Sequence, residues 1–198
     1  MIRSPAERRL STARLDLWTH RECDTAFLHD LFGEAARPKG DVRVINDRCE
    51  VVTGKRFELI YTPQFINRWV GRAESAEQTH GFAFWLATER VTGQPIGVYG
   101  LIGQSDDGPP QVGWYTHRAS RRRGFAVEAV RELIRWAFRE LSLDRVRAVV
   151  LPENTPSQAV AIAAGMRRMP GQVEHAGVPH LAYEVTRDVR AKRCRDAR

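Results

Sequence analysis

The chain has 198 residues, 42% hydrophobic and 28% charged, and carries a formal net charge of +7. This length suits one domain around one core, and no apolar run approaches the roughly 20 residues that cross a membrane. The N-terminus lacks the apolar segment of a signal peptide, and Cys23, Cys49 and Cys194 form no Cys-x-x-Cys pair. We therefore expect a cytoplasmic protein with no membrane contact and no metal.

The positive charge is concentrated at the C-terminal end. Residues 187–198 contain six basic and two acidic side chains, so they contribute +4 and leave +3 for the rest of the chain. A nucleic-acid-binding domain would need a basic face with interleaved aromatic residues, and we expect no nucleic-acid partner. The sequence predicts a single domain over residues 1–187 and a basic, disordered tail over 188–198.

The first elements alternate between strand and helix. Residues 14–18 alternate polar and apolar side chains, which predicts the first strand. Asp24 is a suitable cap for a helix that ends near Gly33. A second helix should begin at Pro63, because proline favours the first helical position, and should end near Gly71.

The rest of the chain predicts more strands. Residues 83–88 and 96–102 are strand-like and are joined by a turn, and a loop leads to another strand over 111–116. One further strand is expected at 181–186, and a long amphipathic helix should follow the strand at 111–116 and run to about Leu141. This order predicts one α/β domain without internal repeats.

The stretch around Ser120 carries the clearest chemistry. Three arginines, Arg121 to Arg123, and Gly124 lie between a strand and the long helix. The first N–H groups of a helix are unpaired and its dipole favours an anion there, and a glycine lets the backbone approach a ligand. The pattern predicts a site for a pyrophosphate-containing ligand. A solvated basic turn is the alternative.

The spacing Arg121-x-x-Gly124-x-Ala126 resembles the Q/R-x-x-G-x-G/A signature of the GNAT superfamily of acetyl-CoA-dependent N-acetyltransferases. Further segments resemble the family in the same order: Phe125-Ala126-Val127-Glu128-Ala129, Trp136-Ala137-Phe138, Arg145 to Val150, Pro152-Glu153-Asn154-Thr155-Pro156-Ser157 and Ala164-Gly165-Met166. The P-x-N-x-x-S form is similar to the branch that contains the ribosomal-protein N-terminal acetyltransferases.

The resemblance implies a mixed, mostly antiparallel sheet with a V-shaped split between central strands, flanked by helices. It implies direct acetyl transfer from acetyl-CoA to a primary amine, either a protein N-terminus or a small molecule. A non-catalytic acyl-CoA-binding module is the alternative, and a homodimer is left open. The residues expected to bind the co-substrate are Trp114, Tyr115, Thr116, Arg121, Arg122, Arg123, Gly124, Phe125, Ala126, Asn154 and Ser157.

The same resemblance suggests catalytic roles. Backbone N–H groups of the strand at 111–116 would stabilise the oxyanion. Ser157 would hydrogen-bond the leaving thiolate, or instead serve the helix backbone. Asn154 would cap that helix, bond the pantetheine arm, or do both. Many relatives place an acidic tyrosine seven residues after the asparagine, but this chain has Ala161 there.

Two features have no assignment. Residues 34–60 look longer than the matching region of the family and would either shape acceptor choice or form a surface hairpin. The general base is not identified. The loop residues considered for it are His80, His117, Glu153, Glu174 and His175. Each of them could instead be a solvated surface group, and His175, which precedes the last strand, could approach the acceptor cleft.

Overall fold

The computed structural model describes residues 7–20, 24–33, 50–53, 56–59, 63–103, 108–175 and 178–187. The expected tail at 188–198, the three cysteines and most of the 34–60 segment lie outside these residues.

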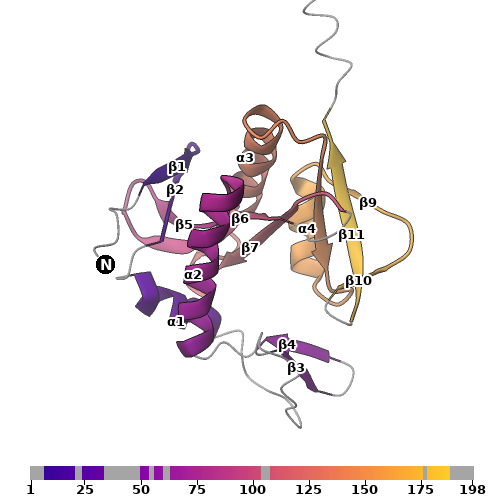
Figure 1. The fold of residues 1–198 in the computed structure, drawn as a ribbon, viewed down its shortest axis with the longest axis horizontal. Helices are drawn as coiled ribbons and strands as arrows, with labels where there is room; N and C mark the ends of the chain where they lie inside the picture. The colour runs from indigo at the N-terminus through magenta and orange to yellow at the C-terminus, as the bar shows by residue number, and fades with distance from the viewer. Residues whose placement is uncertain are drawn as a thin grey trace, which may run out of the picture.

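One large sheet organises the described chain (Figure 1). Its strands follow the order β1-β2-β5-β6-β7-β8-β11-β10, and β9 pairs with β11. Neighbouring strands are antiparallel except β7 and β8, which are parallel. The strands are β1 (Arg8–Ser11), β2 (Leu15–Trp18), β5 (Phe84–Glu89), β6 (Pro95–Ile102), β7 (Gln111–Thr116), β8 (Arg145–Val150), β9 (Arg167–Arg168), β10 (Val173–His175) and β11 (Val178–Thr186).

The first strand of the sheet was not predicted. The alternating residues that we expected to begin the sheet form its second strand, β2, and β1 precedes it in a hairpin. Within β1 only Leu10 is buried, and the other three residues are exposed. An edge strand with one buried side chain has too little apolar alternation to be recognised from sequence.

The helices are α1 (Thr25–Gly33), α2 (Pro63–His80), α3 (Phe125–Arg139) and α4 (Thr155–Ala163). Their expected starting points are confirmed, but the predicted end of α2 is wrong, since the helix continues nine residues beyond Gly71. An exposed glycine inside a helix costs only about 1 kcal/mol, which the buried contacts of Ile66 and Val70 can offset.

Two separate cores cover the two faces of the sheet. Alternate residues of β5 point to opposite faces, so Trp85 packs in the core that contains α3 and Phe84 in the core that contains α1 and α2. Figure 1 shows α2 in front of the sheet and α3 behind it. We call these the α1/α2 face and the α3/α4 face.

A short hairpin stands apart from the large sheet. Strands β3 (Glu50–Thr53) and β4 (Arg56–Leu59) pair only with each other. The described part of the 34–60 segment thus forms a hairpin (Figure 1).

The sheet divides between β7 and β8. The two strands pair at a single position, Gln111 with Arg147, where the Arg147 N–H donates to the Pro110 carbonyl at 3.0 Å. Beyond that position they diverge (Figure 1). The expected mixed sheet with a V-shaped split is therefore confirmed.

Candidate active site

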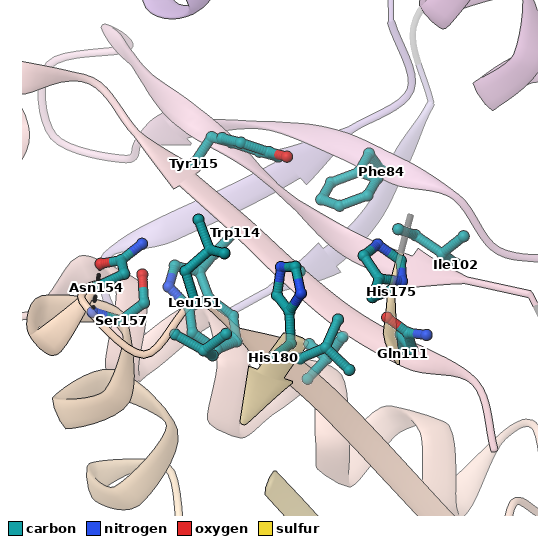
Figure 2. A pocket seen from close by; sticks show the side chains of 14 residues that line it. Phe84, Ile102, Gln111, Trp114, Tyr115, Leu151, Asn154, Ser157, His175 and His180 are labelled. Carbon is teal, nitrogen blue, oxygen red and sulfur yellow. Dashed lines mark hydrogen bonds between the residues drawn. The ribbon is translucent and has the colours of Figure 1, made fainter. Parts of the chain in front are cut away.

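A cavity of about 310 Å³ occupies the split between β7 and β8. It reaches both faces of the sheet. Trp114 on its wall packs with the core under α3, whereas the neighbouring Tyr115 packs with the core under α1 and α2. The α3/α4 face supplies Asn154 and Ser157, and the α1/α2 face supplies Phe84 (Figure 2). Two molecules entering from opposite faces could meet here.

Asn154 and Ser157 lie at the start of α4. The Ser157 N–H donates to Asn154 Oδ1 at 3.2 Å, so Asn154 caps the helix (Figure 2). Among the described residues, the Ser157 hydroxyl has no hydrogen-bond partner, and it faces the cavity. The serine therefore serves the helix through its backbone and leaves its hydroxyl available to a ligand.

The ladder of β7 determines which N–H groups face the split. The His117 N–H donates to the Ile96 carbonyl at 2.9 Å, and hydrogen-bonded pairs recur every second residue in an antiparallel ladder. Tyr115, paired with Val98, thus directs its N–H to β6. Trp114 and Thr116 direct theirs toward β8, beyond the one position where β7 and β8 pair.

The arginine side chains of the loop before α3 are mostly engaged with the protein. Arg121 Nε donates to the Thr116 carbonyl at 2.9 Å. Arg123 Nη2 pairs with Glu89 Oε1 at 2.5 Å, and its guanidinium lies 4.6 Å from the centre of the Phe125 ring. The positive charges of Arg121 and Arg123 are therefore held in fixed positions by these contacts.

The backbone of the same loop offers a row of donors. Among the described residues, no protein acceptor receives the N–H groups of residues 122–127. Gly124 precedes α3 with φ of 80°, and Arg122 also has a positive φ, 62°. Alternating left-handed residues turn successive N–H groups to one side, which forms an anion-binding concavity.

A salt bridge from the first hairpin holds this loop, a feature that sequence reasoning missed. Arg14 Nε bonds Glu128 Oε2 at 2.6 Å, and Arg14 Nη1 donates to the Arg123 carbonyl at 2.9 Å. Although partial burial raises the pKa of Glu128, hydrogen bonds from Thr12 and Arg14 outweigh that effect and hold the pKa below its ordinary value. Glu128 thus stays ionised and ties the start of α3 to the turn between β1 and β2.

A second cavity of about 480 Å³ adjoins the start of α3. Its walls carry three guanidinium groups and one carboxylate: Arg14, Arg131, Arg135 and Glu128, together with Gly124 and Val127. The cavity extends the positive environment of the loop along one side of the helix.

The pattern that describes the "Acetyltransferase (GNAT) domain" matches residues 35–167, two thirds of the chain. The chain belongs to the GNAT acetyltransferase family. Both the arginine loop and the Asn154–Ser157 turn lie within the matched residues.

Individual relatives agree. Over 81 residues the chain is 32% identical to the uncharacterized N-acetyltransferase YjdG of Bacillus subtilis, covering 40% of this chain and 48% of that protein. The chain thus spans about half the length of this relative. An acetyltransferase from Agrobacterium tumefaciens has a TM-score of 0.70 at 21% identity, covering 94% and 97% of the two chains. RimL, a ribosomal alpha-N-protein acetyltransferase solved with coenzyme A, has a TM-score of 0.66 at 16% identity, covering 92% and 99%. These structures share the GNAT fold.

The predicted GNAT site residues fall into two groups, apart from Thr116, which does not line the cavity and whose hydroxyl shares a 2.7 Å hydrogen bond with the Tyr99 hydroxyl. Trp114, Tyr115, Asn154 and Ser157 line the cavity in the split. The loop from Arg121 to Ala126 lies outside that lining, at the start of α3. The Phe125 side chain is only 1% exposed, so a ligand can meet only its backbone. Ala161, at the tyrosine position of many GNAT relatives, is fully buried.

Of the two histidines that line the cavity, only one was a candidate from the sequence. His175 was considered from sequence, while His180 was not, and both line the cavity. His117 instead pairs with Asp30 at 3.0 Å. The signal for His180 was a polar residue beside the apolar run Leu181-Ala182-Tyr183 of β11.

Among the described residues, no group of three or more His, Cys, Asp or Glu side chains could hold a metal ion. None of the described helices is long and apolar enough to span a bilayer.

Proposed function

We propose that this protein is an acetyl-CoA-dependent N-acetyltransferase that transfers the acetyl group directly to a primary amine. The observation that supports the proposal most strongly is the cavity in the split between β7 and β8, which reaches both faces of the sheet. The α3/α4 face receives acetyl-CoA and the α1/α2 face receives the amine, so the two reactants meet without a covalent enzyme intermediate.

The loop before α3 holds the pyrophosphate in this proposal. Its free N–H groups and the helix dipole bind the anion, and Arg121, Arg122 and Arg123 supply charge. Gly124 lets the backbone approach the phosphates. Arg14 keeps the loop in place through the Arg123 carbonyl.

The acetyl thioester lies at the level of Trp114. The backbone N–H of Trp114 faces the split and would donate to the oxyanion of the tetrahedral intermediate. The Ser157 hydroxyl, across the cavity, would donate a hydrogen bond to the departing thiolate, and Asn154 would bond the pantetheine arm while it caps α4.

The acceptor is a primary amine of a protein N-terminus or of a small molecule. RimL, whose name specifies a ribosomal protein as its target, shares the fold, which supports the first alternative. The proposed compartment is the cytoplasm, where both acetyl-CoA and ribosomal proteins are available.

Calorimetry with acetyl-CoA tests the donor site. We expect binding by the intact protein and weaker binding by R121E, because the reversed charge would repel the pyrophosphate. R139E, at the far end of α3 and exposed, is the matched control and should bind normally. Absence of binding by the intact protein would refute the proposal.

Release of free thiol, measured across a panel of amines, tests the reaction itself. Turnover with at least one amine supports an enzyme, and binding of acetyl-CoA without turnover of any amine favours a non-catalytic acyl-CoA-binding module. S157A should lower kcat more than it lowers acetyl-CoA affinity. Equal kcat in S157A and the unaltered protein would remove Ser157 from the mechanism.

A further inference from the structure

Two imidazoles line the part of the cavity that opens on the α1/α2 face (Figure 2). His180 on β11 alternates with Leu181, which packs in the opposite core with α3. His175 lies on the adjacent β10, and the two ring centroids are 5.3 Å apart at an interplanar angle of 81°. His180 thus faces the acceptor side, and Ser157 lies on the thioester side.

The hydrogen bond of His180 determines which ring nitrogen can accept a proton. Its Nδ1 lies 2.9 Å from the Val178 carbonyl oxygen. Because a carbonyl oxygen only accepts, Nδ1 carries the hydrogen and Nε2 of the neutral ring has a free lone pair. The residue is only 7% exposed, so its orientation is fixed by packing as well as by this bond.

The other titratable groups facing His180 are few. Among the described residues that line the cavity they are His175 from β10 and Tyr115 from β7, and no carboxylate, lysine or arginine joins them. A tyrosine hydroxyl is protonated at neutral pH. The imidazoles are therefore the side chains of this lining that can take up a proton, and His180 is the buried one of the two.

We propose that His180 Nε2 is the general base that removes a proton from the acceptor ammonium. This inference rests on the proposed function, because it assigns one step of that reaction. The freed lone pair on nitrogen attacks the thioester carbon, the C–N bond forms, and the C–S bond breaks with its electron pair on sulfur. The second amine proton passes to the thiolate, giving free CoA, and the imidazolium returns its proton to solvent.

The experiment compares variants of the full chain in a thiol-release assay with acetyl-CoA and the best amine of the panel. H180N keeps an amide N–H in place of Nδ1–H and removes Nε2. We expect kcat/KM to fall by about 100-fold or more, and the low-pH limb of the kcat/KM profile to disappear. Acetyl-CoA affinity by calorimetry should change less than about twofold. H80Q, at the exposed end of α2, should behave as the unaltered protein.

Two further variants make the assignment specific. H175N should retain the low-pH limb, because the exposed His175 imidazole is not the proposed base. H180A should regain activity when imidazole is added to the buffer, and this rescue decides the matter if circular dichroism shows H180N to be unfolded.

A retained limb and near-normal kcat/KM in H180N would overturn the assignment of His180. Loss of the limb in H175N but not in H180N would do the same and transfer the role to His175. In both cases turnover by the unaltered protein leaves the proposed function standing. If the unaltered protein acetylates no amine although it binds acetyl-CoA, the proposed function fails and the base assignment fails with it.

Discussion

Arg14 and Glu128 are 114 residues apart in the sequence and share a 2.6 Å ion pair between Nε and Oε2. The Arg14 backbone N–H also donates to Glu128 Oε1, at 2.8 Å. The pair joins the β1–β2 hairpin to the first turn of α3, next to the loop proposed to hold the pyrophosphate. A hairpin at the edge of the sheet thereby takes part in shaping the proposed donor site.

E128Q should destabilise the protein at neutral pH by about 1–2 kcal/mol, because hydrogen bonds to a charged carboxylate are lost. The half-exposed position of Arg14 limits the loss. The folded-state pKa of Glu128 is lowered, so its contribution is present above the unfolded pKa and is lost as pH falls through the folded pKa. The difference in free energy of unfolding between E128Q and the unaltered protein, measured by urea unfolding from pH 7 to pH 3, should become smaller as the pH falls.

The matched control is E132Q on the same helix, whose partner Arg135 is largely exposed and whose pair should contribute little. A difference in E128Q that does not change with pH would contradict the proposed role of the carboxylate. We also expect E128Q to bind acetyl-CoA more weakly than E132Q, because Arg14 would no longer hold the Arg123 carbonyl.

G113A should disturb the acceptor wall of the cavity. A Cβ at Gly113 would lie 2.5 Å from Cζ of Phe84, so the ring must move, at a cost of about 1–3 kcal/mol. Chemical denaturation measures the loss, and F84L in the same chain should recover part of it. G103A is the control, since its Cβ would make only ordinary contacts, with the His80 ring at 3.5 Å and with Cζ of Phe82 at 3.7 Å. Additive effects of G113A and F84L would argue against this contact.

Asn154 can be tested for its two roles with two substitutions. N154A removes the cap of α4 and should cost about 1 kcal/mol. N154D keeps an oxygen that accepts the Ser157 N–H and should retain stability, but it loses the amide donor that would bond the pantetheine arm. Weaker acetyl-CoA binding by N154D at normal melting temperature is the expected result. Normal binding by N154D would limit Asn154 to the cap.

His20 should make the protein sensitive to mild acid. Burial lowers the pKa of His20 to about 4, an effect that the Asp24 carboxylate only partly offsets, and the ring packs edge-on against Trp69. Between pH 6.5 and 4 the unfolded chain binds a proton that the folded protein does not. The free energy of unfolding therefore decreases by on the order of 3 kcal/mol as the pH is lowered from 6.5 to 4.

H20L should remove that part of the pH dependence in melting temperatures recorded between pH 7 and 4. H80Q, with its histidine exposed, should retain it. The same slope in H20L and in the unaltered protein would show that another group is responsible.

Local patterns and the family motifs predicted much of this molecule. Strands such as β7 and β8 alternate or run apolar, and the start of α3 carries its own glycine and arginines. The end of α2 was predicted wrongly because a glycine such as Gly71 often ends a helix, whereas the buried contacts of Ile66 and Val70 stabilise this helix beyond it. Arg14, Phe84 and His180 could not be assigned to the site, since their positions depend on strand pairings between distant parts of the chain.

Because β7 and β8 pair at one position only, Trp114 and Thr116 have backbone N–H groups on an open side of a strand. In an ordinary sheet a neighbouring strand would receive them. A ligand that carries its own amide groups and lies in the split would take the place of that strand and link the two halves of the sheet. Its binding would then act as an added element of structure, raising the free energy of unfolding with the logarithm of ligand concentration once that concentration exceeds Kd.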